Sequence, residues 1–194
     1  LHVNKRLTLK DVPLLDVLSM SLRKELAYAT FAHHVMSHSL FCAWGILEPQ
    51  LMESICLRAV DLMCMSVDDD VFTPNTSAEH VYLVLKGRLR YSKYDKDAPS
   101  IHHHSSETRQ ARLSERSSSF TKPELETVEE HDWVSEAAIW LEWTYSGTLT
   151  SLTKCELLSM HVPTILDILG RHTKVCRINF HYCAAFVRLV QDRG

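Results

Sequence analysis

Histidines are the first side chains in this sequence whose spacing could do chemistry. His34 and His38 lie four residues apart, which would place two metal ligands on one face of a helix. His102, His103 and His104 form a run that could hold a metal ion weakly. No third ligand stands near either group in a recognised pattern, so we expect ordinary solvated or groove-lining histidines and no metal site.

Acidic side chains and a histidine also cluster between residues 129 and 136. Glu129, Glu130, His131, Asp132 and Glu136 could share acid–base work. They have no nucleophile at a useful spacing, and the chain has no Gly-rich phosphate loop or G-x-S-x-G turn. We therefore expect no enzymatic activity.

A serine-rich stretch could carry a modification site. Arg109 and Arg112 precede Ser114, and Arg116 precedes Ser119 by three residues. A basophilic kinase could add negative charge to such a stretch. An inert insertion is the favoured interpretation.

Composition excludes several classes of protein. The chain has 194 residues, of which 45% are hydrophobic, enough for one domain with its own core. The formal net charge is −3, so no excess of basic charge draws in nucleic acid. No apolar run approaches the length of a membrane span. Because the chain begins at Leu1, we expect a fragment of a longer protein, and a membrane span could lie outside it.

The cysteines indicate a reducing compartment. The sequence has six of them, none in a C-x-x-C pair, and each stands among apolar residues. We expect free, buried, reduced thiols and no disulfide, as in cytosolic proteins.

The two ends of the chain have helical periodicity. Ser19 or Ser21 can cap a helix whose apolar positions continue to about residue 36. Pro49 is well placed at the first position of a further helix. Near the C-terminus, Pro163 begins a helix, and residues 174–190 form a last amphipathic helix.

Short strands fill the middle of the chain. Residues 81–91 alternate as two strands joined by a tight turn at Gly87, and further strands are expected at 148–153 and 155–160. Residues 95–131 have few hydrophobic side chains and predict a long, mobile surface insertion. The order of helices, short strands and two helices predicts an α+β fold with a small antiparallel barrel.

Three strings, in this order and spacing, resemble the cyclic-nucleotide-binding domain family. They are Ser21–Leu26 (SLRKEL), Val81–Leu89 (VYLVLKGRL) and Val134–Ile139 (VSEAAI). The version they resemble is that of cyclic-nucleotide-gated, hyperpolarisation-activated and ether-à-go-go-type channels. The resemblance covers residues 10–190 apart from the insertion.

The third string falls on the phosphate-binding cassette of that family. Val134, Ser135, Glu136 and Ala137 occupy cassette positions. In the family, backbone amides at the start of a short helix bind the cyclic phosphate. An arginine nine residues after the cassette glutamate adds a charge-assisted contact. The resemblance implies that Glu136 accepts a hydrogen bond from the ribose 2′-hydroxyl.

The cassette departs from the family pattern where the phosphate should bind. Ser135 stands in place of glycine, and Tyr145, followed by Ser146, stands in place of the arginine. No Arg or Lys occurs between Trp133 and Thr153. Losing one partner of a buried charge pair costs about 2–5 kcal/mol. We therefore expect cAMP or cGMP to be at most a weak ligand, and no other cofactor.

Other positions around the expected pocket are also altered. Asp68 stands near the place of a turn glycine in the family. Phe186 stands where a basic residue of the last helix can lie over the purine, so it either stacks on a base or plugs the pocket. Three tryptophans and Tyr145 cluster between residues 133 and 145; they either line a pocket, fill it or belong to the barrel core, the last being favoured.

The resemblance implies an α+β fold with an antiparallel eight-stranded β-roll, flanked by N-terminal helices and two C-terminal helices. Residues 1–20 would be the end of a channel linker, and residues 21–190 the domain, with its insertion at about 95–131. The implied function is that of a regulatory domain on the cytoplasmic side of a cation channel. Its partners would be the rest of a channel-like parent chain and the other copies of a homotetramer formed through the linker, with no nucleic acid.

Two alternatives stay open. One is a functioning cAMP or cGMP sensor that uses backbone amides and Glu136 without the arginine. The other is a nucleotide-independent interaction module such as a kinase regulatory subunit. The string Ser21–Leu26 favours a channel over a kinase subunit, and Tyr145 argues against nucleotide sensing.

Overall fold

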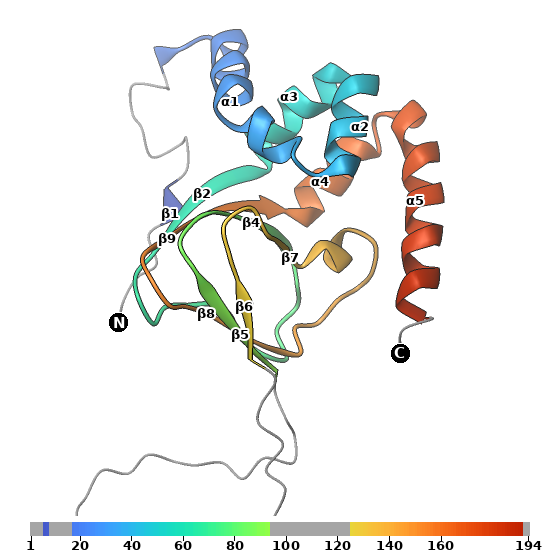
Figure 1. Cartoon of the computed structure of the whole chain (residues 1–194). Coiled ribbons are helices and arrows are strands. Elements are labelled where there is room, and N and C mark those ends of the chain that lie inside the picture. Colours follow the sequence, from blue (N-terminus) through green and yellow to red (C-terminus); the bar gives the residue numbers. More distant parts are fainter. Residues whose placement is uncertain (1–5, 8–16, 94–124, 192–194) are drawn as a thin grey trace, which may run out of the picture.

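The computed structural model describes residues 6–7, 17–93 and 125–191, apart from a few side chains near the end of the last helix. Within these ranges the chain forms an α+β fold of five α-helices and nine strands. Helices cover one end of a two-sheet roll, and one further helix stands beside it (Figure 1). The predicted fold class is therefore confirmed.

The strands form two antiparallel sheets that are not joined into a closed barrel. The first sheet has the order β1 (Arg6–Leu7), β2 (Val60–Met65), β9 (Cys155–His161), β4 (His80–Lys86) and β7 (Trp133–Val134). The second has the order β3 (Asp70–Phe72), β8 (Gly147–Ser151), β5 (Leu89–Lys93) and β6 (Leu125–Val128). Eight strands were predicted, and the ninth is the two-residue β1 at the edge of the first sheet.

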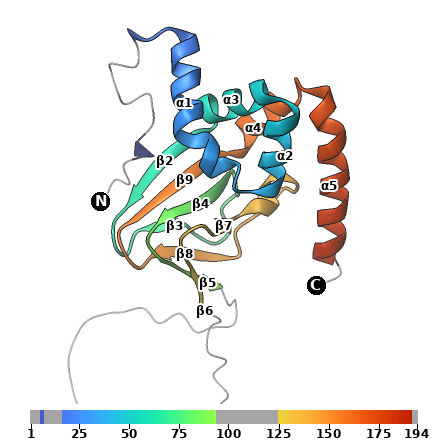
Figure 2. The same ribbon diagram turned by 45° about the horizontal axis from the view of Figure 1, so that its top comes forward.

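Strand β9 is the central element of the first sheet, between β2 and β4. Its residues Leu157, Leu158 and Met160 are fully buried, which breaks the usual alternation of buried and exposed positions. A strand that is buried on both faces has consecutive apolar residues in its sequence, without the alternation of a half-exposed strand. Figure 2 shows β2, β9 and β4 side by side beneath the helices.

The predicted hairpin at residues 81–91 is wrong in its pairing. Strands β4 and β5 both exist, but β4 pairs with β7 and β9, while β5 pairs with β6 and β8. The chain passes from one sheet to the other at Gly87, which has φ +96°. A Cβ there would lie 2.7 Å from both Cys155 Sγ and the Lys154 carbonyl oxygen, so only glycine fits.

Three N-terminal helices and α4 cover the roll. They are α1 (Met20–Val35), α2 (Ser39–Leu47), α3 (Pro49–Arg58) and α4 (Val162–Leu169). Ser19 caps α1 by accepting a hydrogen bond from the Leu22 amide, and Pro49 occupies the first turn of α3, both as predicted. The last helix, α5 (Thr173–Gln191), lies along one side of the roll (Figure 1).

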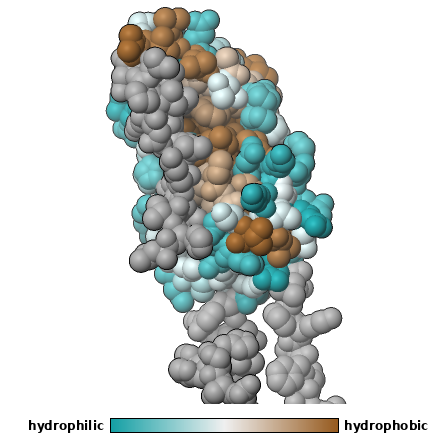
Figure 3. All heavy atoms as spheres, turned by 90° about the vertical axis from the view of Figure 1, so that its left-hand side faces the viewer, coloured by the Kyte–Doolittle hydropathy of each residue, from teal (hydrophilic) through white to brown (hydrophobic). Residues whose placement is uncertain are grey.

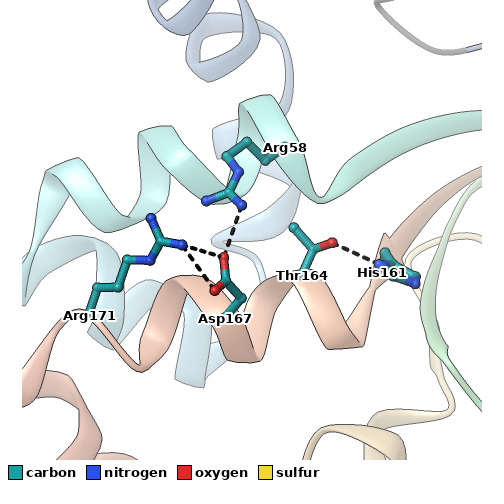
Figure 4. Close-up of polar contacts among 5 residues, drawn as sticks. All are labelled: Arg58, His161, Thr164, Asp167 and Arg171. Atoms are coloured by element: carbon teal, nitrogen blue, oxygen red, sulfur yellow. Dashed lines mark hydrogen bonds and ion pairs between the residues drawn. The ribbon is translucent and has the colours of Figure 1, made fainter.

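An ion-paired carboxylate joins α3 to α4. Asp167 accepts hydrogen bonds from Arg58 and from Arg171, each at 3.0 Å (Figure 4). The hydrogen bond from Arg58, and then that from Arg171, hold the pKa of Asp167 below its usual value. All three side chains are substantially exposed, so these pairs set the relative position of the helices more than they stabilise the fold.

Two sequence predictions need correction. The segment from Leu125 to Val128, expected inside the mobile insertion, is strand β6, paired with β5 along its whole length. Residues 94–124 lie outside the described residues. The cysteines are free, but Cys64 and Cys176 are exposed. Strand alternation explains Cys64, because its neighbours Met63 and Met65 point into the core.

The described helices include none that is both long enough and apolar enough to cross a membrane. On the face that Figure 3 shows, hydrophobic residues lie at the helical end, along the middle and in a separate patch near the opposite end. On α1 the exposed apolar side chains are Met20, Leu22 and Leu26.

Candidate functional site

A cavity of about 320 Å³ opens beside the predicted cassette. Six of the seven predicted site residues line it: Val134, Ser135, Glu136, Ala137, Tyr145 and Ser146. Strands of the second sheet contribute Phe72, Tyr91, Glu126, Val128 and Leu149, and the rest of the wall is Trp133 of β7 and Trp143. Six of the predicted positions therefore lie on one cavity, which separate strands and a loop converge to form, and their role in binding a ligand stays a prediction.

The seventh predicted residue, Phe186, lies on α5. Its side chain is outside the described residues, so the choice between stacking on a base and plugging the pocket stays open. Arg188, two residues further along the helix, is exposed.

Ser135 has a backbone conformation that favours glycine. Its φ is 69° and its ψ is 27°, in the left-handed region that side chains other than glycine rarely adopt. The expected crowding is therefore a strain in the serine backbone of about 1–2 kcal/mol. Asp68, at the turn before β3, also lies in the left-handed region, with φ 65°.

Glu136 begins η3 (Glu136–Ile139), a single turn of 3-10 helix. Its Oε1 lies 2.9 Å from Nε2 of His38, and the imidazole is almost fully buried. His38 also caps α2, because its Nδ1 accepts a hydrogen bond from the Leu40 amide at 3.2 Å. One imidazole thus joins the cassette to the N-terminal helices.

These two hydrogen bonds fix the tautomer of His38. A backbone amide can only donate, so Nδ1 of His38 must be the unprotonated nitrogen. The proton of the neutral ring is then on Nε2, which donates to the Glu136 carboxylate. The glutamate that the family offers to a ribose hydroxyl is here already engaged by the protein itself.

Aromatic contacts also link the cassette region to helices α2 and α5. Trp133 packs on His38 with its ring centroid 5.2 Å away, and on Phe41 of α2 at 5.5 Å. Trp140, at the end of η3, packs on Tyr182 of α5 at 5.2 Å. Such pairs contribute about 0.5–1.5 kcal/mol each beyond the area they bury. The cassette is therefore in contact with both α2 and α5.

Tyr145, at the position of the missing arginine, packs into the roll. It is buried and stacks on Phe72 of β3, with ring centroids 3.8 Å apart and planes 4° from parallel. Its hydroxyl donates to the His80 carbonyl at 3.4 Å. Of the predicted aromatic cluster, Tyr145 is buried in the core and also lines the cavity, and Trp133 and Trp143 line the cavity as well. Trp133 and Trp140 are partly buried against the core.

The cavity wall is negative. Among its described lining residues there is no Lys or Arg, whereas Glu126 and Glu136 both contribute. Burial, and then the charge of Glu136, raise the pKa of Tyr182. A cationic side chain, Lys93, lines an adjoining hollow of about 220 Å³, which shares Tyr91 and Glu126 with the cavity.

Among the other sequence candidates, the histidine pair falls on described residues and does not form a site. Helix α1 ends at Val35, so His34 and His38 lie on different elements and the spacing of four does not place them on one face. His34 instead lies beside His33, and its pKa is lowered by burial and then by the neighbouring His33 and His131. No group of three metal-ligating side chains occurs within residues 17–93 and 125–191. The histidine run at 102–104 and the serine–arginine stretch lie outside the described residues.

Comparison with protein families finds no match, and no curated protein matches the sequence. Solved structures do match. The sensor domain of the transcriptional regulator DNR from Pseudomonas aeruginosa aligns with 87% of this chain and 93% of its own, at a TM-score of 0.58 and 14% identity. The N-terminal domain of a transcriptional regulator from Streptomyces coelicolor A3(2) aligns with 82% of this chain and 94% of its own, at a TM-score of 0.55 and 16% identity.

The third match is the C-linker/CNBHD of zELK channels, crystallised in the presence of cAMP. It aligns with 86% of this chain and 69% of that one, at a TM-score of 0.56 and 12% identity. The chain therefore has the fold of cyclic-nucleotide-binding-type domains. The three structures are described as regulator and channel domains, not as enzymes.

Two residues of the site were missed in the sequence. His38 was weighed as a metal ligand and expected to be an ordinary solvated or groove-lining histidine, although its place directly before α2 is a capping position. Phe72 was not among the predicted site residues, and no local signal pairs it with Tyr145, which is 73 positions away in the sequence. Both partners are brought together only by the fold.

Proposed function

We propose that this chain is a cytoplasmic regulatory domain of a channel-like parent protein, in which the cyclic-nucleotide site binds cAMP and cGMP weakly or not at all. The observation that carries the proposal is Tyr145. At the position where the family has its phosphate-binding arginine, a tyrosine is stacked inside the roll on Phe72.

The charge of the cavity supports this proposal. A cyclic phosphate placed against the cassette would meet two carboxylates and no described cation. The loss of one charged partner alone costs about 2–5 kcal/mol, which is about 30-fold to several thousand-fold in affinity. Glu136 would also have to leave His38 before it could accept a hydrogen bond from a ribose.

The contacts of the cassette support a regulatory role. Through His38 and Trp133 it is bound to the N-terminal helices, which would follow a channel linker, and through Trp140 to α5. A change in cassette packing would then shift both helical elements together and bias a gate. In the parent protein, removal of α5 should change gating, and unchanged gating would contradict this role.

Reversion of the cassette tests the nucleotide part of the proposal. The double variant Ser135→Gly, Tyr145→Arg restores the family's residues at both altered positions. If it folds, as judged by circular dichroism and thermal unfolding, it should bind cAMP at least about 30-fold more tightly than the unaltered chain. A folded double variant with unimproved affinity would show that Tyr145 is not what prevents binding.

One observation favours the second candidate, a working sensor. Glu136 lies on the cavity wall, as a ribose-binding glutamate would. In that case Glu136→Ala should weaken cAMP binding, whereas it should have no effect on a site that binds no nucleotide.

A further inference from the structure

We propose that the cavity beside the cassette binds a small organic cation that carries an apolar or aromatic body. This inference deepens the proposed function and rests on it, since it names the ligand class that replaces the cyclic nucleotide in the same cavity. It is carried by the charge, the exposed aromatic wall and the size of the cavity.

The charge favours a cation. Glu126 of β6 is exposed at the cavity wall and forms no ion pair or hydrogen bond with any side chain in the described part of the chain. Glu136 uses Oε1 for His38, a neutral donor that leaves the negative charge of the carboxylate uncompensated. A positive ligand group between these residues would gain about 1 kcal/mol from each at contact distance in water, and more where water is excluded.

The aromatic wall favours an organic cation over a metal ion. Trp143 is 37% exposed at the cavity and has no ring partner within the described residues. Tyr91 and Trp133 present further aromatic surface, while the Tyr91 hydroxyl is held by Ser146 at 2.9 Å. Indole and phenol faces attract ammonium and guanidinium groups, and their edges bury hydrocarbon. A metal ion would need three or more oxygen or nitrogen ligands, and the two carboxylates come from separate elements.

The size of the cavity fits a ligand built around one ring. Ligand sites in proteins measure about 300–1,000 Å³, and this cavity, at about 320 Å³, is near the lower limit. The stacked rings of Tyr145 and Phe72 form part of its wall. A monocyclic aromatic ammonium therefore matches the space, the charge and the lining together.

A pair of isosteric probes tests this proposal. The chain is titrated with meta-hydroxyphenyl trimethylammonium and with its neutral isostere meta-tert-butylphenol, and binding is followed by the indole NMR signals of Trp133 and Trp143. We expect the cation to bind about tenfold or more tightly than the neutral compound. Equal affinity of the two compounds, or no binding of the cation at millimolar concentration, would overturn the proposal.

Two variants locate the effect. Glu126→Gln should weaken binding of the cation about fivefold and leave the neutral compound unaffected. Glu156→Gln is the matched control, because it removes an exposed carboxylate on β9 outside the cavity, and it should change neither affinity. If Glu126→Gln had no effect, the cation would be bound elsewhere and the proposal would be wrong.

A parallel titration with cAMP separates the two proposals. If cAMP binds at micromolar concentration, the proposed loss of nucleotide binding fails, and the cation proposal fails with it. If neither cAMP nor the cation binds, only the cation proposal fails. Binding of the cation without cAMP supports both.

Discussion

The hydrogen bond between His38 and Glu136 should stabilise the fold measurably. The substitution His38→Asn isolates it, because asparagine is also a good N-cap residue but its side chain is too short to reach Glu136. His38→Ala removes the cap as well. Comparing the two variants therefore separates the capping of α2 from the link to the cassette.

The magnitude follows from the contacts. A hydrogen bond to a charged group contributes about 1.5–3 kcal/mol, and the partial exposure of Glu136 reduces this to about 1 kcal/mol. The imidazole also packs on Phe41 and Trp133, each with a centroid distance of 5.2 Å. Together these give a loss of about 2 kcal/mol for His38→Asn, and about 1 kcal/mol more for His38→Ala.

A double-mutant cycle measures the link itself. The variants His38→Asn, Glu136→Ala and their combination are unfolded in urea at neutral pH, and the coupling energy is calculated from the four free energies of unfolding. We expect a coupling of about 1 kcal/mol. A value below about 0.3 kcal/mol would refute the interpretation that this bond fixes the cassette to α2.

Three further predictions concern the fold around the site. Gly147→Ala should cost about 1–3 kcal/mol in urea unfolding, because a Cβ there would lie 2.4 Å from the Ser92 carbonyl oxygen; a cost near zero would contradict this packing. Iodoacetamide at pH about 8 should label the exposed Cys64 and Cys176 in the native protein but not Cys56, since burial raises the pKa of that thiol to about 12. The labelled residues are identified by mass spectrometry, and labelling of Cys56 as fast as that of Cys64 would contradict its burial. The lowered pKa of Asp167 stabilises the fold above its ordinary 3.8, and this stabilisation is lost as the pH falls through the lowered value. The variant Asp167→Asn should therefore be slightly less stable than the unaltered chain at pH 7 and equally stable in strong acid, and a difference that persists in acid would contradict this cause.

Local signals in the sequence predicted most of the elements. Ser19 and Pro49 marked helix starts, and the resemblance of Val134–Ile139 to a cassette located the cavity. These features depend on neighbours along the chain, so a single sequence is enough to find them. The sequence showed that residues 133–153 bring no Lys or Arg to the cavity, but the residues that β3, β5 and β6 contribute to its wall became known only from the structure.

Features that depend on distant partners were not predictable. Residues 81–91 contain two strands and a turn glycine. The strands join different sheets because β4 pairs with β9 and β5 pairs with β8, and both partners are distant in the sequence. The spacing of His34 and His38 implied one helical face, and the helix end at Val35 separates them. The role of His38 required knowledge that Glu136 lies 2.9 Å away, across 98 positions of sequence.

Calorimetric titration of the unaltered domain with cAMP and with cGMP, up to millimolar ligand, tests the central claim most directly. Tyr145 in place of the arginine, the engaged Glu136 and the negative cavity predict no saturable heat with either nucleotide. Saturable binding at micromolar concentration, weakened by Glu136→Ala, would contradict the account and identify the domain as a nucleotide sensor.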